Sequence, residues 1–371
     1  MFIILKKTKL IVVILGLVLL CSTISLLHIS YSQATSSELE KKYIKWVDFD
    51  IPAGLMKEAI KLDVTSYQEK GNEHISWIEL LAYLGTKYGG DFKKYKPSHL
   101  KNLIKDLDEG KTVTVMAAKL KNFPYYLEAY QAVLGGLVGE FEAEIENENG
   151  KIWQKKYGLK AYSPIAKGYA YDDYDDFGAR RDYGYRRKHL GHDMMALVGT
   201  PVIAVESGVV EVLGWNQYGG WRIGIRSFDG RRYYYYAHLR KNRPFAAGLE
   251  EGQIVMAGNV IGYVGRTGYS ATENVNGIEN SHLHFGLQLI FDESQKEGKN
   301  QIWIDLFELT KLLSNNRCGT LRDNDTKEYS RALGFKEAIP KDHFVPKPGE
   351  AVEEKLETAA PMGSEELGVR S

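Results

Sequence analysis

The chain has 371 residues, of which 44% are hydrophobic and 26% are charged. These fractions are typical of soluble globular proteins and exclude a disordered, collagen-like or multi-span membrane chain. The 48 lysines and arginines equal the 48 aspartates and glutamates in number. Because no net charge draws the chain to nucleic acid, we predict no nucleic-acid partner.

The N-terminus carries the features of an export signal. Lys6 and Lys7 precede an uncharged, mostly apolar run from Leu10 to Leu27, an arrangement that favours a cytoplasmic start and an exported body. The run is borderline for a membrane span of ~20 residues and long for the ~7–15-residue core of a cleaved signal. We therefore predict that residues 1–34 anchor an extracytoplasmic protein in the cell membrane, with cleavage after Ala34 and secretion as the alternative.

The chain has only two cysteines, Cys21 and Cys318. Cys21 lies inside the apolar run, so we predict no intramolecular disulfide. Two cysteines so far apart also exclude a thiolate zinc cage. Any metal site in this chain therefore has to use histidine and carboxylate ligands.

Residues 35–150 are predicted to form a small all-α domain. Apolar residues recur there at three- and four-residue spacing, and prolines and glycines delimit the repeats. The predicted helices begin at Pro52, near Trp77 and at Pro97, and a further helix runs from Tyr126 to Val138.

Residues 151–315 are rich in glycine, turn signals and short alternating runs, which predict an antiparallel β domain. The predicted strands are Val202–Val212, Trp221–Ser227, Arg232–His238 and His282–Leu289. A C-terminal extension, residues 316–371, ends in a glutamate-rich tail that we predict to be disordered. The fold class is therefore α+β and multidomain.

Two short motifs could hold a metal ion. His282-Leu283-His284-Phe285 lies in a predicted strand, where residues two apart share a face, so both histidines point the same way. In His189-Leu190-Gly191-His192-Asp193 the first and last residues share a face of an extended segment, while His192 faces away. One histidine from each motif together with Asp193 gives two nitrogens and one oxygen. Three protein ligands leave a fourth tetrahedral position for water, as in catalytic zinc sites.

A third motif, Tyr236-Ala237-His238-Leu239, ends a predicted strand. His238 could be a further ligand, a general base or a surface histidine. The tyrosines from Tyr233 to Tyr236 alternate faces in a strand, so half are predicted to pack inward while the others could stack on sugar or peptide. Packing is the favoured assignment for all except Tyr236, which lies beside His238.

The order of these motifs and the residues in them resemble those of the lysostaphin-type, or LytM-domain, zinc endopeptidases, which cut peptidoglycan cross-bridges and stem peptides. The resemblance covers about 110 residues, from Phe177 to Leu287. The shared elements are Phe177-Gly178-x-Arg180, His189-x-Gly191-x-Asp193, Gly199-Thr200-Pro201-Val202, Ser207-Gly208-x-Val210, Tyr236-x-His238-Leu239, Gly262-x-Val264-Gly265-x-Thr267-Gly268 and His282-Leu283-His284-Phe285.

The resemblance assigns a role to each candidate residue. It implies that His189, Asp193 and His284 bind zinc and that His238 and His282 are catalytic. The motif by itself could not decide which of His282 and His284 is the zinc ligand and which is catalytic. It also implies that the β domain is a lysostaphin/LytM-type catalytic domain and that bacterial peptidoglycan is the substrate, with the protein at the cell membrane or in the cell wall.

The chain departs from the family pattern in two places near the site. The family often has His-Pro after the early arginine, where this chain has Arg181-Asp182-Tyr183, and the polar stretch from Tyr269 to Asn280 is longer than in compact members. We predict that this stretch lies near the substrate cleft and influences substrate choice. No departure removes a proposed ligand.

Basic residues crowd the segment that enters the first zinc motif. They could bind carboxylates of stem peptides or anionic wall polymers, because arginine pairs with carboxylates through two hydrogen bonds. A solvated loop balanced by the nearby aspartates is the favoured interpretation. The basic residues are Arg180, Arg181, Arg186, Arg187 and Lys188, and the aspartates are Asp172, Asp173, Asp175 and Asp176.

We therefore predict an exported zinc endopeptidase that hydrolyses peptidoglycan peptides. The alternatives are a non-catalytic LytM-like scaffold that activates another wall hydrolase, or a regulated protease on a protein substrate. A scaffold would lack at least one of the five site residues, and all five are present. The predicted partners are peptidoglycan, the membrane through the N-terminal segment, and a regulatory partner at the helical domain.

Overall fold

The computed structural model describes residues 43–346, except for residues 70–72, 149, 184 and 298–299. From Lys45 onward the described residues belong to one compact unit. No helix within the described residues is both long and apolar enough to cross a membrane. The predicted N-terminal anchor, Cys21 and the predicted disordered tail all lie outside the described residues.

The helical part begins after Pro52, and the helices predicted at Pro52, Trp77 and Pro97 are confirmed. Ser76 caps one helix by accepting a hydrogen bond from the Glu79 backbone N–H, and Gly89 ends that helix in the left-handed conformation with φ 67°. The helices are α2 (Ala53–Gln68), α3 (Trp77–Tyr88), η1 (Phe92–Lys94), α4 (Pro97–Asp108), α5 (Val113–Ala117) and α6 (Phe123–Leu134).

The sequence prediction was wrong at the end of this helical part. The helix predicted from Tyr126 to Val138 ends at Leu134, and Val138 already starts a strand, β1, inside the region predicted to be all-α. Hydrophobic and acidic residues alternate through this strand, a period of two that suits a strand rather than a helix. The predicted domain boundaries at residues 150 and 315 themselves stay predictions.

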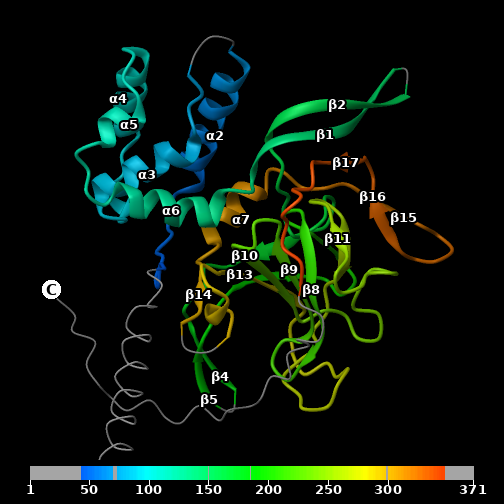
Figure 1. Ribbon diagram of the computed structural model, residues 1–371. Helices are drawn as coiled ribbons and strands as arrows, with labels where there is room; N and C mark the ends of the chain where they lie inside the picture. The colour runs from blue at the N-terminus through cyan, green and yellow to red at the C-terminus, as the bar shows by residue number, and fades with distance from the viewer. Residues whose placement is uncertain (1–42, 70–72, 149, 184, 298–299, 347–371) are drawn as a thin grey trace, which may run out of the picture. The chain divides into compact units, whose positions relative to one another are not determined.

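The main sheet is antiparallel and holds eight strands in the order β11-β8-β9-β10-β13-β6-β3, with β14 pairing to β13. Figure 1 shows β8, β9, β10 and β13 lying side by side in it. Its strands are β3 (Tyr171–Asp173), β6 (His192–Ala196), β8 (Gly208–Asn216), β9 (Gly220–Ser227), β10 (Arg232–Ala237), β11 (Ile254–Val255), β13 (His282–Leu289) and β14 (Ile302–Trp303).

Three predicted strands are confirmed with small changes in bounds, but the predicted strand Val202–Val212 is two strands. The chain leaves extended structure after Ile203 and re-enters it at Gly208, whose backbone packs against β9 so closely that a Cβ would lie 2.2 Å from the Arg226 carbonyl oxygen. The smaller sheets contain β1 (Val138–Asn147), β2 (Gly150–Leu159) and β17 (Phe335–Lys336); β7 (Pro201–Ile203) and β12 (Val260–Tyr263); β4 (Arg180–Tyr183) and β5 (Tyr185–Lys188); and β15 (Thr320–Arg322) and β16 (Tyr329–Arg331).

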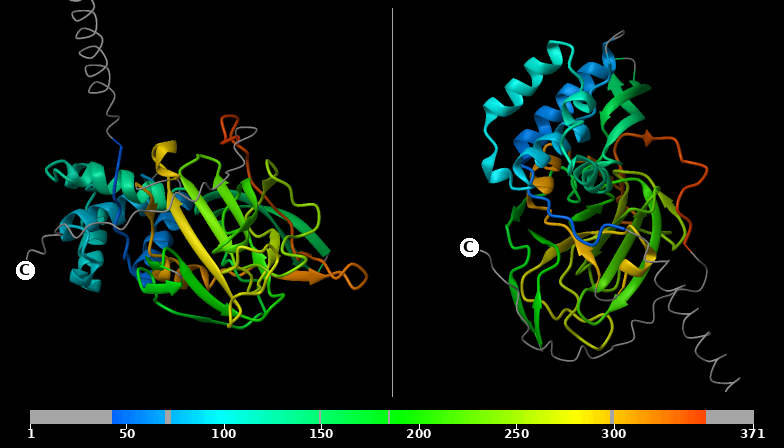
Figure 2. Two further views of the ribbon diagram at one scale, coloured as in Figure 1. Left: turned by 90° about the horizontal axis from the view of Figure 1, so that it is seen from below. Right: turned by 60° about the vertical axis from the view of Figure 1, so that its left-hand side comes forward.

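The helical part packs against a short helix that follows the sheet, α7 (Phe307–Leu313). The backbone N–H of Ala53, at the start of α2, donates to the Glu308 carboxylate at 2.7 Å. Figures 1 and 2 both show α7 next to the helices of this part. Helices and main sheet are thus joined at the side of the sheet where β14 leads into α7.

The two faces of the main sheet differ in chemistry. Leu283, Phe285 and Leu287 of β13 are fully buried on the core face, and Tyr234 and Tyr236 of the neighbouring β10 pack with them. Alternation then places the remaining residues of β13, His282 and His284 among them, on the opposite face. The core face fixes the register, because a slip by one residue would bury the polar set instead.

Candidate active site

The side chains of His189, Asp193 and His284 converge on one point beside the main sheet. Among the described residues, they form the group of histidine and carboxylate donors whose atoms lie close enough to share a metal ion. His189 Nε2 lies 3.0 Å from Asp193 Oδ1 and 2.9 Å from His284 Nδ1, and His284 Nδ1 lies 3.1 Å from Asp193 Oδ1. Three electron-pair donors this close repel one another unless shared protons or a cation lie among them.

Strand register produces this convergence. β6 and β13 pair so that Asp193 lies directly opposite His284, and residues opposite each other in a sheet project from the same face. His189 comes from the segment that links β5 to β6. Gly191 lets this segment approach β13, because a Cβ there would lie 2.5 Å from His284 Nε2 and 3.0 Å from the Phe285 carbonyl oxygen.

The electrostatics hold Asp193 and His284 in the protonation states that bind a cation. Burial raises the pKa of Asp193, but hydrogen bonds from His189 and His284 outweigh this and hold it well below its usual range. Burial lowers the pKa of His284. Asp193 is therefore ionised and His284 neutral near pH 7.

Sequence reasoning missed Asp176 as a member of the site. Its backbone oxygen lies 3.1 Å and its carboxylate Oδ1 3.2 Å from His189 Nδ1. Burial lowers the pKa of His189, but Asp176 and Asp193 outweigh it and raise the pKa to about 9. A carboxylate behind a ligating histidine fixes the ring and makes it a stronger donor. Asp176 precedes His189 by 13 residues, so spacing within the motif gave no signal for it.

His238 and His282 form a second pair next to these three donors. Their ring centroids are 4.8 Å apart, and the His238 ring lies 5.7 Å from that of His284. His238 Nδ1 donates to the Thr267 carbonyl at 3.0 Å, and His282 Nδ1 donates to the Asn280 carbonyl at 2.8 Å. Because a carbonyl only accepts, each Nδ1 carries a proton. The Nε2 of His282 faces the Asp193 carboxylate, with 3.6 Å between Nε2 and Oδ1.

His238 is held in place at a conformational cost. It follows the last residue of β10 and has φ 61°, a left-handed conformation that is unfavourable for a side chain with a Cβ. Its backbone N–H donates to the Gly219 carbonyl at 2.8 Å, which helps to hold that conformation. Burial holds the pKa of His238 well below its usual range, so the imidazole is neutral near pH 7.

Two expectations about neighbouring side chains have different outcomes. His192 faces away as predicted: it is buried on the core face, where it contacts the Asp173 carboxylate and the Phe307 ring of α7. Tyr236 is the wrong candidate for substrate contact, since it is fully buried on the core face. Tyr235 lies on the site face instead, with its ring 5.8 Å from that of His284.

The polar stretch that follows Gly268 begins at the site. The Tyr269 ring lies 5.8 Å from the His238 ring. Further along, Asn274 Oδ1 accepts from the Trp221 indole at 2.9 Å and from the Asn242 backbone at 2.8 Å. The stretch is therefore fastened to the loops beside His238.

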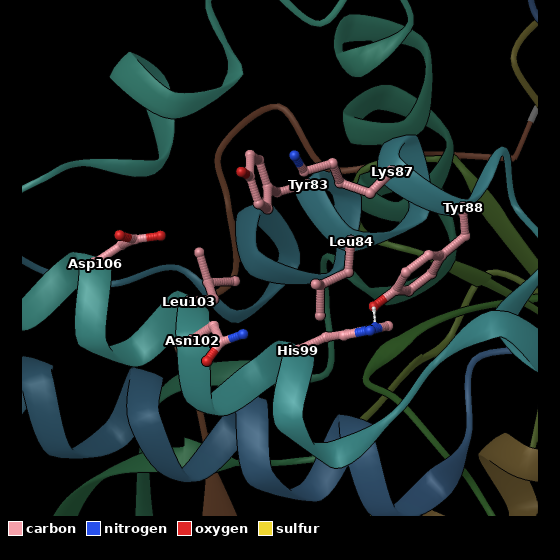
Figure 3. Close-up of a pocket in the computed structure, with 8 residues that line it drawn as sticks. All are labelled: Tyr83, Leu84, Lys87, Tyr88, His99, Asn102, Leu103 and Asp106. Carbon is pink, nitrogen blue, oxygen red and sulfur yellow. Dashed lines mark hydrogen bonds between the residues drawn. The ribbon is translucent and has the colours of Figure 1, made fainter.

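A cavity of about 310 Å³ lies away from these residues, between α3 and α4. Figure 3 shows the side chains of the two helices facing each other across it, with Tyr88 hydrogen-bonded to His99 Nδ1 at 2.8 Å. None of the five predicted site residues lines it. The lining residues are Tyr83, Leu84, Lys87, Tyr88, His99, Asn102, Leu103 and Asp106.

Known proteins resemble the part of the chain that contains the five predicted site residues. Residues 187–298 match the model of peptidase family M23. An L-Ala--D-Glu endopeptidase of Bacillus subtilis is 45% identical over 124 residues, which cover 33% of this chain and 36% of that protein. Lysostaphin of Staphylococcus simulans is 39% identical over 98 residues, which cover 26% of this chain and 17% of that protein.

Among solved structures, one from Ruminococcus gnavus that is named after LytM is 23% identical and has a TM-score of 0.49. The match covers 74% of this chain and 92% of that one. By contrast, the chain spans only 36% and 17% of the lengths of the two curated relatives.

Proposed function

Since residues 187–298 match the model of peptidase family M23, we propose that this chain is an exported zinc-dependent endopeptidase that hydrolyses peptide bonds in bacterial peptidoglycan. The observation that carries the proposal is the convergence of His189 Nε2, Asp193 Oδ1 and His284 Nδ1 within 3.1 Å of one another, beside the second histidine pair, His238 and His282. The names of the relatives support peptidoglycan as the substrate.

The donor set suits zinc. Two imidazole nitrogens and one carboxylate oxygen are a set found in catalytic zinc sites, and ligands about 2.0–2.1 Å from a tetrahedral zinc lie about 3.4 Å apart, close to the separations here. Asp176 provides the carboxylate that commonly supports a ligating histidine. Zinc bound there would lower the pKa of a bound water from ~15.7 towards ~7 and polarise the scissile carbonyl.

The remaining histidines supply proton transfer. In both His238 and His282 the Nε2 atom is the one left to exchange a proton, and either ring, when unprotonated there, can accept a proton from the attacking water and return it to the leaving amine. The other, when protonated on Nε2, can donate a hydrogen bond to the negative charge that develops on the substrate oxygen. The buried Nδ1 contacts to Thr267 and Asn280 keep both rings oriented for these roles.

Export and membrane attachment belong to the proposal on sequence grounds alone. The lysines at residues 6 and 7 and the apolar run that follows them support a single N-terminal anchor, or a signal cleaved after Ala34. An exported position would bring the site to peptidoglycan. A regulatory partner at the helical part belongs to the same proposal.

Muropeptide analysis tests the activity. The purified chain is incubated with peptidoglycan, with chelator, and with chelator followed by zinc, and the products are identified by mass spectrometry. We expect new peptide ends that disappear with chelator and return with zinc. Casein serves as the protein-substrate control. A folded, zinc-loaded chain that releases no peptide would contradict the proposal and favour the scaffold alternative, whereas casein cleavage without peptidoglycan cleavage would favour a protease on proteins.

A further inference from the structure

We propose that Arg187 binds a carboxylate of the substrate and directs this site to stem peptides that carry a free acid rather than to neutral glycine bridges. The inference rests on the function proposed above and names the substrate class of the same site. It starts from the charges on the hairpin formed by β4 and β5, which leads directly to His189.

This hairpin places like charges opposite one another. Arg181 pairs with Arg187 across the two strands, and Arg180 pairs with Lys188. Like charges directly opposite in a sheet are destabilising unless other groups neutralise them. For Arg181 the neutralising groups are present, because its guanidinium contacts the carboxylates of Asp176 and Asp193, the latter at 3.1 Å.

The interpretation that nearby aspartates balance the basic residues does not extend to Arg187. Asp173 is engaged by His192 and by the Thr310 hydroxyl at 3.4 Å, and Asp176 by His189 and Arg181. Among the side chains that the structure describes, no carboxylate forms an ion pair with Arg187. The hairpin therefore presents a guanidinium that no described carboxylate neutralises.

Arg187 is held firmly despite this. Its guanidinium carbon lies 4.8 Å from the Tyr218 ring centroid and 5.0 Å from that of Tyr269, and its Nη2 donates to the Tyr269 hydroxyl at 2.6 Å. Since the same Tyr269 ring lies 5.8 Å from the His238 ring, Arg187 is separated from a proposed catalytic histidine by one aromatic side chain. Tyr269 itself has φ 48°, which indicates that its position is constrained.

A guanidinium fixed in this way suits a carboxylate ligand. Arginine presents five N–H donors in a planar fork that matches the two oxygens of a carboxylate, and stacking on aromatic rings reduces the entropy lost on binding. The backbone amides of a glycine bridge offer no negative charge to this fork. Peptidoglycan stem peptides do, through the free carboxyl groups of their acidic residues.

Matched synthetic peptides test the inference. One stem peptide carries its free carboxyl groups, and in its partners each carboxyl in turn is a carboxamide. For the wild-type chain we expect kcat/KM to be about 10- to 100-fold higher for the acid than for one of the amides, the range for a hydrogen bond to a charged group. In Arg187→Gln this ratio falls to about 1, mainly through a higher KM for the acid peptide.

Three further variants separate recognition from folding. Lys188→Gln removes the same charge from an exposed position on the same hairpin and keeps the ratio. Arg187→Lys keeps the positive charge but loses the planar guanidinium, and we expect it to retain part of the acid-to-amide preference. Tyr269→Phe loses the hydroxyl that holds Nη2 and lowers the ratio less than Arg187→Gln. Zinc content and unfolding midpoint confirm that each variant is folded.

The outcomes distinguish this inference from the proposed function. Equal cleavage of acid and amide peptides by the wild-type chain, or an unchanged ratio in Arg187→Gln, would overturn the role of Arg187 and leave the endopeptidase intact. Failure of the wild-type chain to cleave any peptide or whole peptidoglycan would overturn both.

Discussion

Strand β10 carries a buried polar cluster at each end, and the two clusters are built differently. At its start, Arg232 is fully buried, and its guanidinium donates to the Glu206 carboxylate at 2.8 and 3.1 Å and to the Ala132 carbonyl at 2.9 Å. Just after its end, His238 joins the four other proposed site residues. Both clusters place ionisable groups in the protein interior, which is costly unless each group has a partner.

The first cluster satisfies its own charges. Glu206 accepts hydrogen bonds from Nε and Nη2 of Arg232 and from the Tyr234 hydroxyl at 2.6 Å. The bond to Ala132 links the sheet to the end of α6. Close packing adds to this link, because a Cβ at Gly136 would overlap Glu206 and lie 2.9 Å from the guanidinium of Arg232. Such a closed network stabilises and positions, and leaves nothing to bind.

In the second cluster, five ionisable side chains from different parts of the chain converge on one point. The Asp193 carboxylate accepts hydrogen bonds from the rings of His189 and His284, which occupy the place of a cation, and His238 adopts a left-handed backbone conformation beside them. This arrangement is unfavourable for folding alone and favourable for binding a cation and moving a proton. The difference predicts that substitutions in the second cluster affect chemistry, and substitutions in the first affect stability.

The largest expected effect follows from removing a ligand. Asp193→Ala takes the only carboxylate from the proposed triad, and we expect zinc retention and peptidoglycan cleavage to be abolished. Zinc per protein is measured by mass spectrometry of the metal after gel filtration. His192→Gln, one residue away but facing the core, should keep zinc. Near-stoichiometric zinc in Asp193→Ala would show that the ligands are wrongly assigned.

Removing a proton-transfer group separates binding from chemistry. His238→Ala leaves all three donor atoms in place, so we expect full zinc content with cleavage reduced about 10²- to 10⁴-fold, the usual contribution of a general acid or base. The same loss accompanied by loss of zinc would instead make His238 a ligand. An unchanged rate would exclude it from the mechanism.

The sequence predicted the five histidine and aspartate residues of the second cluster, but not the residues that hold them in place or the strand that follows α6. Motif spacing and strand alternation brought His189, Asp193 and His284 together, and family resemblance separated His284 from His282. Asp176 was not predicted as part of the site, because its contact with His189 depends on how the β4–β5 hairpin folds, which local periodicity does not encode. The sequence also offered Arg187 as one of five basic residues without distinguishing it from its neighbours. The first strand, β1, was read as helix because its alternating pattern follows directly on the helical one of α6.

The first cluster should respond in stability rather than activity. Arg232→Met leaves the Glu206 carboxylate buried without its main partner, which costs about 3–5 kcal/mol of unfolding free energy. Tyr234→Phe removes one hydrogen bond to the same carboxylate and should cost about 1.5–3 kcal/mol. Denaturant unfolding measures both. Because neither residue touches the proposed site, zinc content per folded molecule should stay unchanged, and a drop in zinc affinity would mean that the two clusters are coupled.

The smallest effect is expected at Asp176, which contacts both a proposed zinc ligand, His189, and the guanidinium of Arg181. Asp176 contacts His189 and Arg181 but supplies no donor atom to the triad, so its role is to orient His189 and raise its basicity. Asp176→Asn keeps the backbone contact to His189 Nδ1 and removes the charge, and we expect zinc affinity to fall about 10- to 100-fold, measured by competition with a chelator. Asp175→Asn makes the same change at the exposed neighbouring position and should leave the affinity unchanged. If both variants bound zinc like the wild-type chain, the carboxylate of Asp176 would belong with the self-satisfied contacts of the first cluster, serving Arg181 rather than the metal.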